Sequence, residues 1–394
     1  ALLPTLASAQ VDEERLQLMR ESTSYTDVAD AADGDDPFDV YLRVGFVQSR
    51  TSGTIRREVT DPTSASGIPA FQKIGDYTRS RNVLEVGADV GIFHDLALTV
   101  RLPVVLSDSY DIGAPARTVT ENTDGSGADI FGLPFHGPTR SGIEAIHLGV
   151  AWAPLNQNRV HEVPSWVILL DVGVPAGPLM RPCASGASCD AGISRGNVIT
   201  HFETRIARRH RYVEPYVGLG VTAEFPTRTR YRFRPNGNLN GYQHTLPPIV
   251  GDLNVGAAFV PWENLPHFQR LVFDVRFSAT YVSTGHDYSP LYDALGSSTN
   301  ANLTTPNCED GAPLSSGCAS PLVQVPFTGL TDTAAYGRFG GRAAVEVQAA
   351  RYVLFSVGTN VMYQTAHAIT SADICNASIA GSGAPRPPCR ADRA

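Results

Sequence analysis

The chain has 394 residues, of which 42% are hydrophobic and 18% are charged. Its 36 glycines and 28 prolines favour long connections between elements over one compact helical body. The formal net charge is −8 and no stretch is rich in lysine and arginine, which excludes nucleic acid as the expected partner.

The first ten residues are typical of the end of a secretory signal peptide, because an apolar stretch precedes small residues at a cleavage site. We therefore expect residues 1–9 to be a remnant of that peptide. A membrane-spanning helix needs roughly 18 uncharged apolar residues, and the best candidate, 163–180, is interrupted by Asp171, a glycine and a proline. The sequence predicts an exported protein that could enter a membrane only as strands.

The six cysteines form three local pairs, each inside a segment rich in glycine, serine and proline: Cys183 and Cys189, Cys308 and Cys318, Cys375 and Cys389. This placement predicts three disulfides within loops and an oxidising compartment. Zinc binding is the alternative. No pair has the two-residue spacing of zinc ligands and no histidines are grouped nearby, so no metal is expected.

From residue 38 onward, apolar residues alternate with polar or small ones, as in strands that have one apolar face. We predict eleven such strands, at 38–46, 82–93, 96–106, 142–152, 166–174, 197–207, 212–224, 249–259, 271–282, 335–348 and 352–363. Lengths of about 9 to 14 residues match tilted strands that cross the hydrocarbon layer of a bilayer. The sequence therefore predicts an all-β fold.

The connections between these strands alternate in length. The short ones lie near 93–95, 154–164, 208–211, 261–269 and 348–351. The long ones lie near 51–80, 107–140, 175–196, 225–247 and 284–334, and from 366 onward. Every long loop should therefore leave the same end of an up-and-down antiparallel sheet.

Over residues 38–365, this pattern resembles bacterial outer-membrane β-barrel proteins, with a porin-like architecture. The resemblance implies a transmembrane barrel in outer-membrane lipid, with short periplasmic turns and long extracellular loops. All six cysteines would then lie in surface loops. Trp152, Trp166 and Trp262 would lie at the short-turn ends, where an interfacial aromatic girdle is expected.

One feature departs from that family, because single-chain barrels have an even number of strands and usually end in a strand with a terminal aromatic residue. An open eleven-stranded sheet would leave unpaired backbone groups in lipid, at several kcal/mol each. We therefore expect a twelfth, closing strand that is absent from this sequence, and we expect 366–394 to be an extracellular loop.

If the apolar positions face lipid, the opposite positions face the lumen. The expected constriction residues near mid-membrane are Arg43, Arg101, Arg276, Arg342 and Asp171. The expected acids nearer the periplasmic mouth are Asp39, Asp89, Glu203, Glu214, Asp274 and Glu346. An arginine ring could select solutes that carry a carboxylate, sulfate or phosphate. The alternative is a network of salt bridges that fills a narrow barrel.

Residues 10–37 precede the barrel and should lie on the periplasmic side. Residues 11–21 are charged with a small apolar face, which predicts a short helix. The acids that follow, at positions 27, 30, 33, 35 and 36, lack the spacing of an EF-hand, so we expect a solvated linker there.

The function that this reading predicts is a channel for passive or substrate-selective passage of small hydrophilic solutes. The first alternative is a non-conducting barrel that acts as a surface-exposed binding or structural protein, alone or in a larger complex. A secreted, soluble all-β protein is an alternative of a different class. No enzyme activity or cofactor is expected, because His286 and Asp287 are the only adjacent pair at the outer rim and adjacent residues of an extended segment point apart.

Overall fold

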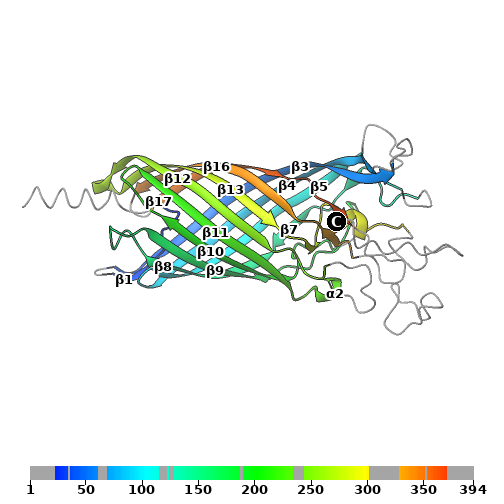
Figure 1. Cartoon of the computed structure of the whole chain (residues 1–394). Coiled ribbons are helices and arrows are strands. Elements are labelled where there is room, and N and C mark those ends of the chain that lie inside the picture. Colours follow the sequence, from blue (N-terminus) through cyan, green and yellow to red (C-terminus); the bar gives the residue numbers. More distant parts are fainter. Residues whose placement is uncertain are drawn as a thin grey trace, which may run out of the picture.

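The computed structural model describes residues 23–33, 36–60, 69–114, 122–123, 128–186, 190–233, 244–300, 328–350 and 353–370. Within these ranges, no helix is both long enough and apolar enough to cross a membrane. The main element is an antiparallel β-sheet of eleven strands that curls into a half-barrel (Figure 1).

The eleven strands are β3 (Val40–Thr60), β4 (Pro69–Phe93), β5 (Leu96–Gly113), β8 (Ala145–Leu155), β9 (Ser165–Pro175), β10 (Asn197–Ala207), β11 (Val213–Pro226), β12 (Val250–Asn264), β13 (Gln269–Val282), β16 (Tyr336–Ala350) and β17 (Val353–Gln364). Their order in the sheet is β17-β16-β13-β12-β11-β10-β9-β8-β5-β4-β3, so each strand pairs with its neighbour along this series. Two short strands, β6 (Phe135–His136) and β7 (Arg140–Ile143), also pair with β5. The prediction of an all-β fold with eleven strands is confirmed.

The first hairpin is much longer than the alternation predicts. The ladder between β3 and β4 runs from the Val40–Val90 pair to the Thr60–Pro69 pair. The predicted long connection at 51–80 is therefore wrong, because most of it is strand. Residues 51–60 carry polar and β-branched side chains on both faces, so they lack the one-sided apolar pattern that reveals a strand.

Most of the exposed large apolar side chains lie on one face of the sheet. Leu42 and Val44 on β3 are 79% and 77% exposed, and Val357 on β17 is 77% exposed. Exposed aliphatic or aromatic residues at alternate positions continue this face over β5, β8, β11, β12 and β13. The opposite positions include buried acids such as Asp171, which is 1% exposed. The two faces of the sheet thus differ in polarity.

At one end of the half-barrel lie the short connections that join β4 to β5, β8 to β9, β10 to β11, β12 to β13 and β16 to β17; we call this the short-connection end. It includes the 3₁₀ helix η1 (Leu265–His267). The hairpin of β1 (Ala31–Asp33) and β2 (Asp36–Phe38) leads into β3 at this same end. The opposite end is the long-connection end.

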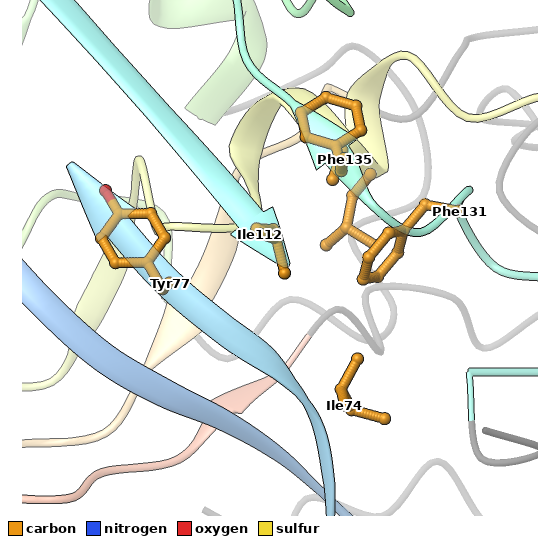
Figure 2. Packing of buried hydrophobic residues seen from close by; sticks show 7 residues of the cluster. Ile74, Tyr77, Ile112, Phe131 and Phe135 are labelled. Atoms are coloured by element: carbon orange, nitrogen blue, oxygen red, sulfur yellow. The ribbon is translucent and has the colours of Figure 1, made fainter. Parts of the chain in front are cut away.

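The long connections fold together into a cap. The cap contains α2 (Arg230–Phe233), α3 (Tyr292–Gly296) and a three-stranded sheet of β14 (Gly285–Asp287), β15 (Thr331–Thr333) and β18 (Ile369–Thr370). Figure 2 shows its apolar cluster, which consists of Ile74, Tyr77, Ile112, Phe131, Phe135, Ala294 and Leu295. These residues come from β4, β5, β6, α3 and the connection between β5 and β6, so the cluster joins segments that are far apart in the sequence.

The cysteine predictions fall mostly outside the described residues. Cys183 lies in the cap and is 3% exposed, whereas the other five cysteines are not among the described residues. The three loop disulfides therefore remain predictions, as do the helix at 11–21 and the extracellular loop at 366–394, of which 371–394 lie outside the described residues.

Removing bulk from the cap cluster should loosen the cap. Ile112 is fully buried, so Ile112→Ala should lower the unfolding free energy of the cap by about 2–5 kcal/mol. Hydrogen exchange of the backbone amides near Phe131 and Leu295 would measure this. The matched control is Ile92→Ala, since Ile92 is 48% exposed at the other end. Equal exchange in both variants would show that this cluster does not hold the cap.

Candidate functional site

The N-terminal segment of residues 23–30 crosses the concave face of the half-barrel. The Ser24 hydroxyl donates to both carboxylate oxygens of Glu346 on β16, at 2.9 and 2.7 Å. Ala29, only five residues away, packs against Ala97 on β5. Five residues span at most about 18 Å, whereas the seven strand spacings from β16 to β5 measure roughly 34 Å along the sheet. The segment is too short to follow the curve of the sheet, so it must run straight across the concave side to reach both strands.

The same contacts identify the two faces of the sheet. Tyr41 on β3 packs against the cluster that contains Val28 and Ala29, so the side chains on the parity of Tyr41 point to the concave side. Its neighbour Leu42 therefore points to the convex side. The exposed apolar face is the convex face, and the charged face is the concave one.

The segment lies at the short-connection end. Glu214, which it contacts, is the second residue of β11, and Ala97 is the second residue of β5. Arg205, the third residue from the end of β10, donates to the carbonyl oxygen of Tyr25 at 3.3 Å. These strand ends all adjoin short connections, so the segment covers the concave face near that mouth.

Aromatic and cationic groups surround Tyr25 of the segment. Its ring stacks on that of Tyr216, with 3.9 Å between the centroids. The guanidinium carbons of Arg205 and Arg276 lie 5.3 and 4.8 Å from the Tyr25 ring centroid, within the range of cation–π attraction. The backbone N–H of Thr23 donates to the Glu214 carboxylate at 2.7 Å.

The prediction of a solvated linker, made for the acids at 27, 30, 33, 35 and 36, is wrong at Asp30. Asp30 forms an ion pair with Arg159 at 2.8 Å, and its carbonyl oxygen accepts the N–H of Asp39 at 2.8 Å. The physical reason is that the uncharged stretch Thr-Ser-Tyr-Thr supplies donors and an aromatic ring for the acids and arginines of the wall. Contacts between residues that are far apart in the sequence cannot be predicted from a local sequence pattern.

Four of the predicted lumen acids form ion pairs with arginines. The pairs are Arg43 with Asp89, Arg101 with Asp171 at 3.0 Å, Arg205 with Glu203 at 2.7 Å, and Arg276 with Asp274 at 3.7 Å. The carboxylates of Glu214 and Glu346 accept hydrogen bonds from the N-terminal segment, and Asp39 donates its backbone N–H to the carbonyl oxygen of Asp30. Much of the positive charge of the concave face is thus compensated.

Two histidines extend these pairs. His147 Nδ1 lies 2.7 Å from Asp171, whose other oxygen faces Arg101. His201 Nε2 lies 3.5 Å from Glu203. The side chain of Arg101 remains 55% exposed while that of Asp171 is 2% exposed, so the arginine reaches from a buried acid towards the enclosed space.

Arg342 differs from the other predicted constriction residues. It lies directly opposite Arg276 in the register between β13 and β16, so two like charges share one level of the concave face. Among the described residues, none forms an ion pair with Arg342, and Asn360 lies opposite it on β17. This position therefore carries the least compensated positive charge of the predicted set.

Sequence reasoning did not identify Tyr25 and Tyr216 as site residues. Tyr216 has the concave-face parity of its strand, and that parity was the only available signal. Tyr25 precedes the sheet, so strand periodicity could not place it. In the part of the chain that the structure describes, no group of three or more histidine, cysteine or acidic residues could hold a metal ion.

A buried ion pair anchors the cap at the other end. Arg140 Nη2 and Asp293 Oδ1 are 2.5 Å apart, and their side chains are 5% and 2% exposed. Asp293 also accepts the backbone N–H of Cys183 at 2.9 Å and the hydroxyl of Tyr110 at 3.1 Å. Arg140 donates to the carbonyl oxygen of Ala191 at 2.7 Å. One carboxylate thus joins three separate long connections.

No protein-family model matches the chain, and no curated protein matches it either. The site must therefore be interpreted from its own geometry.

The unfolding free energy of the cap should depend on pH because of Asp293. Burial raises the pKa of the Asp293 carboxyl, although the neighbouring Arg140 guanidinium opposes this rise. The folded cap then holds the proton more tightly than the unfolded chain, so its unfolding free energy should fall as pH rises from the usual carboxyl range through the raised value. Asp293→Asn should abolish this slope, because the amide does not titrate.

Hydrogen exchange of the cap amides at several pH values would measure this slope. Asp190→Asn is the control, since Asp190 is exposed on the connection between β9 and β10. A pH slope that survives in Asp293→Asn would contradict this assignment.

Proposed function

We propose that the protein is an outer-membrane β-barrel channel for small hydrophilic solutes, with the convex face in lipid and the concave face lining the pathway. The observation that carries the proposal is the exposed apolar face. Leu42, Val44 and Val357 are each more than three-quarters exposed on it. Soluble monomers rarely expose contiguous apolar patches beyond a few hundred Å². Lipid hydrocarbon would remove the cost of that exposure.

Two tryptophans support this placement. Trp152 and Trp262 are 48% and 49% exposed and lie near the short-connection end of β8 and β12. An indole ring has an apolar body and one N–H donor, which suits the boundary between lipid and water. In the proposed orientation, this end faces the periplasm.

The two edges of the sheet indicate how the barrel would close. Neighbouring strands are antiparallel throughout the series of eleven, so the edge strands β3 and β17 point in the same direction. A twelfth strand antiparallel to both would fit between them and give an even strand number. It would also pair the edge backbone groups, which cannot stay unpaired in lipid.

The concave face supports passage of hydrophilic solutes. It carries charged pairs whose arginines remain accessible, such as Arg43, with a side chain that is 65% exposed, and Arg101. Glycines also occupy concave positions: Gly87 lies between Arg43 and Arg101 in the register, which leaves room beside them. Water and small polar molecules would be stabilised on such a surface.

A non-conducting barrel is the second candidate, and one observation favours it. The segment 23–30 covers the short-connection mouth, and the cap gathers the long connections at the other end. If both covers are permanent, the barrel would act through its surface loops as a binding or structural protein.

Planar-bilayer recording of the purified protein, under oxidising conditions, would separate the two candidates. A channel should give reproducible conductance steps with modest ion selectivity. Silence from inserted protein would favour the non-conducting barrel. Heat-dependent mobility on an SDS gel tests the soluble alternative, because a detergent-resistant barrel migrates differently before and after boiling.

Arg342 should influence ion selectivity more than an arginine outside the pathway. Arg342→Glu replaces the least compensated positive charge of the concave face, so the reversal potential in a salt gradient should shift towards cation selectivity. Arg50→Glu makes the same charge change at an exposed position on the convex parity of β3 and should have little effect, because salt screens charges beyond about 8–10 Å. Equal shifts in both variants would contradict the proposed pathway.

A further inference from the structure

The N-terminal segment is held in place by hydrogen bonds that water could replace, by one aromatic stack and by one apolar cluster. Thr23 and Ser24 bind the carboxylates of Glu214 and Glu346, and Tyr25 stacks on Tyr216. The Tyr25 hydroxyl has no hydrogen-bond partner among the described residues, so its ring supplies the contact.

Apart from the Tyr25 stack, the apolar part of this contact is one cluster. Val28 and Ala29 gather there with Val167 and the alanines at positions 97, 151 and 153, and Tyr41 and Leu169 pack against it. The alanine side chains bury little area. Withdrawal of the segment would therefore expose the apolar surface of this cluster and of the stacked rings.

The wall behind the segment remains compatible with water. Arg205 is paired with Glu203, and Arg276 lies near Asp274, within the sheet itself. These pairs do not need the segment for charge compensation. A permanent filling of the barrel would be expected to bury apolar side chains, whereas this wall is charged and can be solvated.

We propose that residues 23–30 form a displaceable gate at the short-connection mouth, held closed by Tyr25 between Tyr216 and the guanidinium groups of Arg205 and Arg276. This inference rests on the proposed channel for its consequence, which is that release of the segment opens the pathway. The movement itself does not depend on conduction.

The test uses a cysteine within the segment as a reporter of its release. Thr26 is 4% exposed, so Thr26→Cys should react slowly with a charged, membrane-impermeant methanethiosulfonate reagent while the gate is closed. The full-length protein is reconstituted under oxidising conditions. Adding Tyr25→Ala removes the stacked ring, and the reaction rate should rise at least tenfold. In the bilayer, Tyr25→Ala without the cysteine should raise the open fraction.

Two comparison variants make the result specific. Tyr25→Phe keeps the ring and loses only a hydroxyl without a hydrogen-bond partner, so its rate should match that of the parent. Tyr281→Ala makes the same truncation at a tyrosine that is 61% exposed on the convex face, and should leave the rate unchanged. Heat-dependent mobility on an SDS gel confirms that each variant is folded.

The outcomes separate the gate from the channel. A tenfold faster reaction without any current supports the gate and overturns the proposed channel. Currents that are unchanged by Tyr25→Ala, together with a thiol that stays unreactive, leave the channel standing and overturn the gate. Rapid reaction at the same rate in the parent and in Tyr25→Ala also overturns it, because the segment would then not be held by Tyr25.

Discussion

The strict alternation of side chains along the strands is the constraint on which the rest of the structure depends. A strand sends successive side chains to opposite faces, so placing Leu42 and Val44 on the convex face commits Tyr41 and Arg43 to the concave one. A register shift of one residue would invert both faces at once. The hydrogen-bonded ladders fix that register in every strand, and the separation of apolar and charged faces follows from it.

This separation determines how the interior is organised. The exposed large apolar side chains lie mostly on the convex face, and the charged side chains lie on the concave face. A buried acid there, such as Asp171, is stabilised by a cationic neighbour. The carboxylates of Glu214 and Glu346, which form no such ion pair among the described residues, accept hydrogen bonds from the N-terminal segment. The conducting and non-conducting interpretations differ in whether this segment and the cap stay in place.

The sequence predicts the strands well because their signal is local. Each of the eleven is visible in the alternation of its own residues, whereas the extension of β3 to Thr60 was missed because its outer part has two polar faces. The partners of the concave face were partly predictable, since parity identifies Arg101 and Asp171 as facing the same side. Two features could not be predicted: the stacking of Tyr25 on Tyr216 and the contacts by which Asp293 joins three loops. Both are contacts between residues far apart in the sequence, which local patterns do not encode.

The most direct test of the central claim is a nitroxide scan of residues 252–259 on β12 in liposomes, recording accessibility to oxygen and to a water-soluble nickel chelate. The account predicts a period of two. Labels at odd positions such as Val255 should meet oxygen in lipid, and labels at even positions such as Asn254 should be shielded from lipid. Equal access of the nickel chelate to both parities would place water on both faces and would contradict the account.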